Sequence, residues 1–220
     1  MKTYNSLVIW VVCLSLLLAT VMPYAFSLLK IIFMPRNVSM WYQLELYQWL
    51  LAGCGIYMLL RRFFFRNIEW VETFSHELTH TVVAMLTFRT VLLFQVNESG
   101  GMVTTAGRHR FTEVLTALSP YCLPVFTYVM LLIRPLIANG GLWVFDLLTG
   151  MTLCFHIVCF VKQTSPRQPD IRQYPLGFSY LYLFVAHVMN FCIILVSFFP
   201  GYHVFSSFWR MVCAVWSAVI

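Results

Sequence analysis

Long apolar runs dominate the chain, and short polar connections separate them. About 20 mainly apolar residues are enough for a helix to cross the hydrocarbon core of a bilayer. The predicted spans are Ser6–Leu29, Trp41–Leu60, Ile68–Phe88, Thr112–Ile133, Leu142–Val161 and Leu176–Phe199. Pro120 and Pro124 predict a kink in the fourth span, because proline lacks the backbone N–H that a helix needs. The pattern therefore predicts an all-α polytopic membrane protein of about six transmembrane helices, forming a single integral membrane domain over residues 1–220.

Two short segments after the third span depart from the helical pattern. Val91–Val96 and Met102–Thr105 are rich in residues that favour strands, and Asn97–Gly101 between them has the composition of a turn. We therefore expect a short β-hairpin directly after the third predicted helix.

The composition supports a membrane location. Hydrophobic residues make up 60% of the chain and charged residues only 10%, whereas ordinary globular domains carry about 25% charged residues. The net charge of +6 then reflects topology and contact with lipid headgroups, and it does not indicate a nucleic-acid partner. The seven cysteines lie in apolar runs without any CxxC pair, so the sequence indicates neither a disulfide framework nor a structural zinc knuckle.

The third span carries an HExxH motif, His76-Glu77-Leu78-Thr79-His80. Residues four apart share one face of a helix, so both imidazoles can reach one metal ion. Glu77 is then placed to take a proton from a water molecule that the metal activates. An ionisable group at the centre of a bilayer costs about 3 kcal/mol on insertion scales, so such groups usually face a polar interior. The motif therefore predicts a functional metal site within this helix.

The third ligand of the predicted metal site has two candidates, because a catalytic zinc takes three protein ligands and HExxH supplies two. With a rise of about 1.5 Å per residue, His80 lies about 12 Å from Phe88, and His156 lies about 9 Å from Lys162. If the predicted spans alternate in direction, His156 lies near the level of His80. Asp170 stands in the polar connector Lys162–Pro175 and can join the site only if that connector folds inward. Depth alone favours His156 and leaves Asp170 open.

The motif, the hairpin and the order of spans resemble the site-2 protease group of intramembrane zinc metalloproteases, the M50 peptidases, and within it the compact bacterial M50B-like branch. The resemblance covers about residues 68–199, the metalloprotease-like core. In that family a later aspartate completes the zinc site, and Asp170 matches it in position and residue type. The resemblance thus implies His76, His80 and Asp170 as ligands, with His156 as the alternative. The usual Leu-Asp-Gly and the preceding Asn-Pro motif are absent, and Asp170 stands in Gln-Pro-Asp-Ile instead.

The resemblance also implies an activity. It implies that Zn²⁺ is the cofactor, that Glu77 is the catalytic base, and that a peptide bond in or near the bilayer is hydrolysed by metal-activated water. The substrate would be a membrane protein or peptide, bound near Ser99, Gly100 and Gly101 at the hairpin turn. The implied location is the bacterial cell (inner) membrane.

The alternative is a non-catalytic membrane protein, either an inactive relative of the protease or a metal-binding scaffold. An intact Glu77 favours the enzyme, because metal binding alone does not need that carboxylate.

Overall fold

The computed structural model describes residues 40–63, 68–97, 100–107, 109–137 and 139–198, together with Trp209 and Cys213. Most of these residues are helical. The longer helices are α2 (Met40–Phe63), α3 (Glu69–Leu86), α4 (Arg110–Leu118), α5 (Val125–Ile133), α6 (Leu142–Gln163) and α8 (Leu176–Val196). The short elements are α7 (Pro169–Arg172) and three 3-10 turns, η1 (Ser119–Tyr121), η2 (Arg134–Leu136) and η3 (Asn139–Gly141). The predicted first span, residues 6–29, lies outside the described residues.

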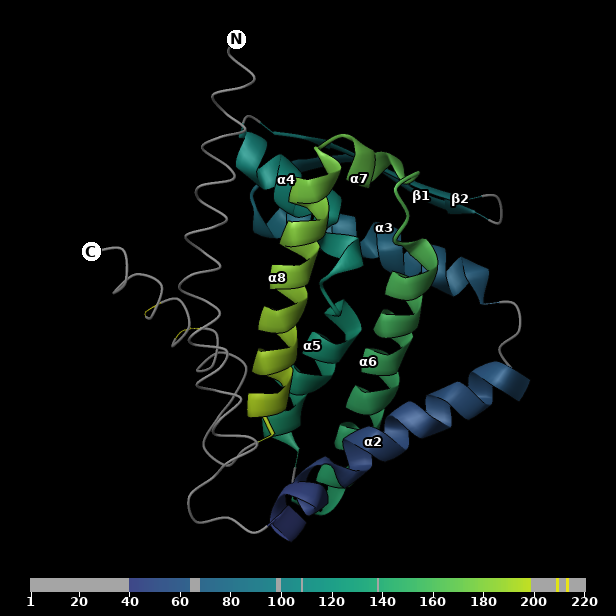
Figure 1. The fold of residues 1–220 in the computed structure, drawn as a ribbon, viewed down its shortest axis with the longest axis vertical. Helices are drawn as coiled ribbons and strands as arrows, with labels where there is room; N and C mark the ends of the chain where they lie inside the picture. The colour runs from purple at the N-terminus through teal and green to yellow at the C-terminus, as the bar shows by residue number, and fades with distance from the viewer. Residues whose placement is uncertain are drawn as a thin grey trace.

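The predicted hairpin is confirmed. Strand β1 (Thr90–Asn97) pairs antiparallel with β2 (Gly100–Ala106), and Asn97 stands opposite Gly100 in the register. The hairpin packs against α3, and Figure 1 shows both lying across the upper ends of α5, α6 and α8. The helices α5, α6 and α8 run side by side below, and α2 packs against the first half of α6.

Two of the described helices, α6 and α8, are long and apolar enough to cross a membrane. The bent pair formed by Arg110–Tyr121 and Val125–Leu136 counts as a third if it is a single broken span. The number of about six spans is therefore not confirmed. Helices α2 and α3 form where they were predicted, but they do not meet the same criterion, and α3 carries Glu69, Glu72 and Glu77. In addition, α3 crosses the other helices instead of running along them (Figure 1).

The kink predicted in the fourth span is confirmed as a bend of 86°. The backbone N–H groups of Cys122 and Leu123 bond to the carbonyl of Ser119, which closes the turn before Pro124. Asn190 of α8 donates its Nδ2 to the carbonyl of Cys122 at 3.1 Å. A buried carbonyl without a partner would be costly, so this side chain stabilises the break from the neighbouring helix.

The connector between α6 and α8 folds inward. Ile171 of α7 is fully buried in a core cluster with Val114, Leu118, Tyr121, Cys122 and Leu183. Ser179 at the start of α8 donates its Oγ to the carbonyl of Ile171 at 3.0 Å. The core contact and the hydrogen bond hold α7, and with it Asp170, against the broken helix.

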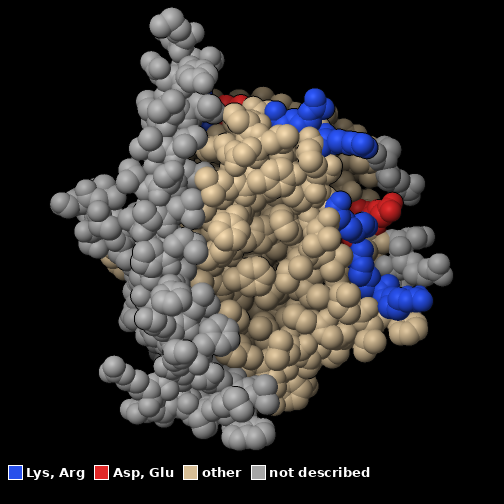
Figure 2. All heavy atoms as spheres, viewed as in Figure 1, with Lys and Arg blue, Asp and Glu red and all other residues tan. Residues whose placement is uncertain are grey.

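The distribution of charge matches a membrane-embedded bundle. In the view of Figure 2, the surface over α6 and α8 is almost free of charged side chains. The Lys and Arg side chains visible there gather at the end where α7 lies and at the edge where α2 and α6 end. Charged groups avoid the hydrocarbon core and collect at its borders, so the uncharged surface in this view has the composition expected for contact with lipid.

Close packing of α2 against α6 depends on two glycines, and this generates a first prediction. A Cβ atom on Gly150 would lie 2.0 Å from the carbonyl oxygen of Leu50, and one on Gly53 would lie 2.0 Å from that of Leu147. Small residues let membrane helices approach this closely. We expect Gly150→Ala to lower the free energy of unfolding by about 1–3 kcal/mol, the usual cost of overpacking, measured by thermal or denaturant unfolding in detergent.

Gly55 provides a matched control for that measurement. It lies in the same helix as Gly53, and a Cβ atom added there meets nothing within 4 Å. Gly55→Ala should leave the stability unchanged or raise it by up to about 1 kcal/mol through helix propensity. Equal stabilities for the Gly150 and Gly55 variants would contradict the α2–α6 contact.

Candidate metal centre

Helix α3 presents both histidines of the HExxH motif on one face. The imidazole rings of His76 and His80 lie 4.9 Å apart between centroids and meet edge to face. Both side chains are mostly buried, with 14% and 11% of their surface exposed. Glu69 and Glu72 in the first turn favour the helix, because negative charge stabilises a helix N-terminus.

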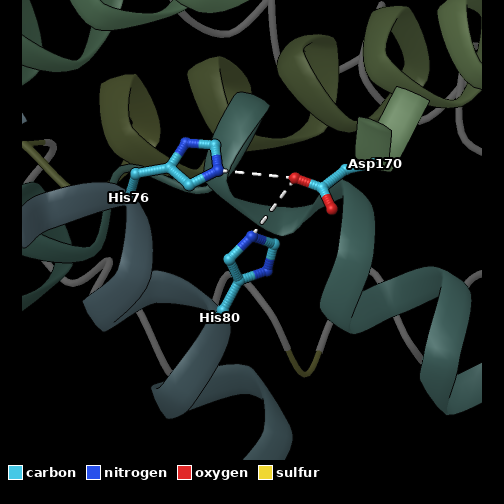
Figure 3. A group of neighbouring side chains, drawn as sticks. All are labelled: His76, His80 and Asp170. Atoms are coloured by element: carbon cyan, nitrogen blue, oxygen red, sulfur yellow. Dashed lines mark ion pairs between the residues drawn. The ribbon is translucent and has the colours of Figure 1, made fainter. Parts of the chain in front are cut away.

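Asp170 completes a group of three side chains. Its Oδ2 lies 3.5 Å from Nε2 of His76 and 3.4 Å from Nε2 of His80, and Figure 3 shows both rings pointing at this oxygen. One ligand atom from each residue lies within 4.8 Å of the others. Pro169 begins α7, where its fixed φ suits the first helical position, and this places the Asp170 carboxylate above α3.

The three donors could hold a metal ion, and two of their three separations match zinc. Ligands bound to zinc at about 2.0–2.2 Å in tetrahedral geometry lie about 3.3–3.6 Å apart, and the His–Asp separations of 3.4 and 3.5 Å fall in that range. Two imidazoles and one carboxylate also form a usual donor set for catalytic zinc, with a fourth position left for water. Within the described part of the chain, no other three His, Cys, Asp or Glu residues come together in this way.

Oxygen acceptors orient the two imidazoles through Nδ1, the ring nitrogen that does not face Asp170. Nδ1 of His76 lies 3.1 Å from Oε1 of Gln163, and Nδ1 of His80 lies 2.7 Å from the backbone carbonyl of Thr116. Because both partners accept, each Nδ1 carries the proton and each Nε2 keeps a lone pair for a metal. The tautomer that metal binding requires is therefore already selected.

Ion pairs hold the end of α6 against α3. The buried carboxylate of Glu72 lies 2.6 Å from Nζ of Lys162 and 2.9 Å from Nη1 of Arg61. Glu72 and His76 are one turn apart on α3, and Lys162 and Gln163 are neighbours on α6. The ion pair thus sets the register in which Gln163 meets His76.

The hairpin lies directly against Glu77. A Cβ atom on Gly101 would lie 2.4 Å from Cγ and 2.7 Å from Oε1 of Glu77, so only glycine permits this approach. Gly100, which precedes it, has φ +147°, a backbone conformation that favours glycine. Ser99 lies outside the described residues. The structure thus brings Gly101 to the site, and the substrate-binding role of Ser99, Gly100 and Gly101 stays a prediction.

The Asp170 carboxyl remains ionised in this environment. Burial alone would raise its pKa, but when both rings carry a second proton, on Nε2 in place of a metal, their N–H groups and positive charge outweigh burial and hold the pKa well below its usual range. The hydroxyl of Tyr121 also donates to Oδ2, at 3.3 Å. A carboxylate is the form that binds a metal, so no proton has to leave Asp170 first.

His156 does not join the group. It is buried within α6, where its ring stacks on His187 of α8 with 5.8 Å between centroids. Helix α6 reaches the motif through Gln163 instead, two turns further along. The depth estimate favoured His156 because it treated α3 and α6 as parallel spans, whereas α3 crosses the bundle. The metal-binding role of Asp170 stays a prediction.

Sequence reasoning missed three supporting groups: Gln163, the Thr116 carbonyl and Tyr121. Each lies far from its partner in the chain, by 87, 36 and 49 residues. The proline-rich break around Tyr121 was the one local signal near any of them, and it indicated a bend but no role.

Comparisons with known proteins give one match. A family model described as Peptidase M50B-like matches residues 46–168, more than half of the chain. Nothing matches the chain among curated proteins or among solved structures. The matched segment contains α3, the hairpin and α6, and it ends two residues before Asp170.

The geometry of the three donors generates a second prediction. Purified protein should bind about one zinc ion, and His76→Ala or His80→Ala should abolish this binding, because each removes one of three ligands. Asp170→Asn should lower zinc affinity by more than the 10–100-fold that is typical of an outer partner, since a neutral amide replaces a carboxylate. Competition with a chelator of known affinity measures the effect.

His156→Ala is the control for the Asp170 variant. It removes a buried imidazole that lies outside the donor group, so zinc affinity should stay within about tenfold of wild type, the lower limit for an outer partner. A larger loss of affinity in His156→Ala than in Asp170→Asn would show that the third ligand has been assigned wrongly.

Proposed function

The chain belongs to the Peptidase M50B-like family, and from this premise we propose that it is an intramembrane zinc metalloprotease that cleaves a peptide bond in or near the bilayer. Proteins of the M50 family are membrane proteins and, in general, zinc metalloproteases. The observation that carries the proposal is the set of three donor atoms within 4.8 Å of one another, with Glu77 next to the first histidine.

Each residue of the site has a defined task in this proposal. His76 and His80 would hold the metal through Nε2, with Asp170 as the third ligand. A zinc ion at this position would supply a Lewis acid for the water and for the scissile carbonyl. Glu77 accepts the proton of the attacking water and later delivers it to the leaving amine. Glu77 is 8% exposed, so bulk water has little access to its carboxylate.

The hairpin is the proposed guide for the substrate. A helical substrate hides its peptide bonds in its own backbone hydrogen bonds, so the segment to be cut must first be extended. A two-stranded hairpin offers strand edges with which an extended segment can pair. Because Gly101 of β2 lies against Glu77, a segment paired with the hairpin would run close to the base.

The proposed setting is a multi-pass position in the bacterial cell (inner) membrane, with a membrane protein or peptide as substrate. The apolar helices α6 and α8 support the membrane location. The site lies at the end of the bundle where the charged side chains gather (Figures 1 and 2). Cleavage near the border of the hydrocarbon layer agrees with this position, because water reaches that depth more easily than the bilayer centre.

A third prediction concerns the proton acceptor. Glu77→Gln nearly preserves the shape of the side chain and removes its basicity, and Glu77 is not assigned as a ligand. The variant should keep its zinc and lose at least about 100-fold in cleavage rate, the lower range for a general base. Metal analysis together with cleavage of a transmembrane peptide in proteoliposomes measures both properties.

Two outcomes would redirect the proposal. Loss of zinc in Glu77→Gln would make Glu77 a ligand. If zinc-loaded wild type cleaves no member of a panel of transmembrane peptides, and Glu77→Gln matches it in zinc content, the non-catalytic metal-binding alternative is favoured.

A fourth prediction concerns the contact between hairpin and base. Gly101→Ala must displace either Glu77 or β2, because the added Cβ has no room. A displacement of about 1 Å in a catalytic group can cost 100-fold in rate, so cleavage should fall by roughly that factor while zinc affinity stays within a few-fold. Gly177→Ala is the control, because a Cβ there meets nothing within 4 Å. Equal activities of the two variants would disprove the contact.

A further inference from the structure

The three candidate ligands all contact one short segment, Thr116–Tyr121, which lies at the bend between α4 and α5. The carbonyl of Thr116 accepts the hydrogen bond from His80 at 2.7 Å. The Tyr121 ring packs edge to face on His76 with 5.1 Å between centroids. The Tyr121 hydroxyl donates to Oδ2 of Asp170 at 3.3 Å. Tyr121 therefore contacts two ligands that come from different parts of the chain.

The surroundings of Tyr121 keep its side chain in place. It is 1% exposed and belongs to the core cluster that also contains Leu118 and Ile171. Its backbone lies in η1, which the hydrogen bonds of Cys122 and Leu123 to the carbonyl of Ser119 close. A ring that is packed on all sides cannot change its rotamer, so the fold sets the direction of its hydroxyl toward Asp170.

Asp170 needs such a partner more than the histidines do. The histidines stand on a helix of 18 residues, whereas Asp170 stands in a helix of four residues, and its side chain is 29% exposed. The oxygen that faces both imidazoles is the same Oδ2 that accepts from Tyr121. A carboxylate oxygen has two lone pairs, so it can bind a metal and accept this hydrogen bond at once.

We propose that Tyr121 is a positioning residue of the metal site, whose hydroxyl fixes the Asp170 carboxylate and whose ring sets the orientation of His76. The inference rests on the metal site proposed above. It assigns Tyr121 no contact with substrate and no proton transfer. Removing the hydroxyl should release Asp170 while leaving the core packing intact.

Tyr121→Phe and Tyr174→Phe form a matched pair for the test. Tyr174 packs against the same core cluster, and its buried hydroxyl has no hydrogen-bond partner among the described residues. Both variants lose one hydroxyl from the same region, but only one loses a bond to Asp170. The full-length protein in detergent is titrated with Zn²⁺ against a chelator, and the visible absorption spectrum of the Co²⁺-loaded protein reports the ligand field.

We expect Tyr121→Phe to bind zinc about 10–100-fold more weakly than wild type and to shift the Co²⁺ absorption bands. Tyr174→Phe should match wild type in both measurements. If Tyr121→Phe cannot be purified in folded form, Tyr121→Met keeps an apolar side chain without the hydroxyl and carries the same expectation.

The inference is overturned if Tyr121→Phe has the affinity and the spectrum of wild type, or if both tyrosine variants lose affinity equally. Failure of the metal site itself gives a different result, because wild-type protein would then bind neither Zn²⁺ nor Co²⁺ before any variant is made.

Discussion

A helix that contains Pro120 and Pro124 cannot continue straight, and the 86° bend at this point determines where the rest of the site can lie. The bend turns η1 toward α3, so that a backbone carbonyl and a tyrosine reach the HExxH face. Ile171 packs at this bend in one core cluster with Leu118, Tyr121 and Cys122. A straight helix would carry Tyr121 past the motif, and α7 would lose the core contact that holds Asp170 in place.

Among the described residues, ion pairs hold several of the charged side chains that lie near the apolar helices. Glu72 joins Arg61 and Lys162 beside α3, and Asp146 pairs with Arg134 at the start of α6. A buried charge without a partner would be strongly destabilising, so each pair allows a charged residue to stay near the apolar layer. In the metal site, a bound cation would offset the charge of Asp170.

The elements that local patterns describe could be predicted from the sequence. Spacing placed His76 and His80 on one face, the turn residues indicated the hairpin, and the prolines indicated the break. The choice between Asp170 and His156 depends on how α3 crosses α6, which is a tertiary property. The residue pattern of α3 predicts a helix but contains nothing about its direction. The estimate that assumed a parallel span favoured His156, which lies outside the group formed by His76, His80 and Asp170.

Tyr121 and Gln163 illustrate the same limit in another way. A tyrosine beside two prolines and a glutamine at the end of an apolar helix are ordinary residues until their partners are known. Their partners, Asp170 and His76, lie 49 and 87 residues away in the chain. The resemblance to a family identified Asp170 as a candidate ligand. No periodic pattern in the sequence relates the segment between α6 and α8 to the HExxH motif.

The contact between the end of α6 and α3 links the site to the lipid around it. Helix α6 is one of the two described helices that are apolar enough to cross the bilayer, and its last two residues are Lys162 and Gln163, which hold Glu72 and His76. Helices tilt when the hydrocarbon layer becomes thinner or thicker than their apolar length. A tilt of α6 would pull directly on the ring of His76, so bilayer thickness would act on the geometry of the metal site without any separate sensing domain.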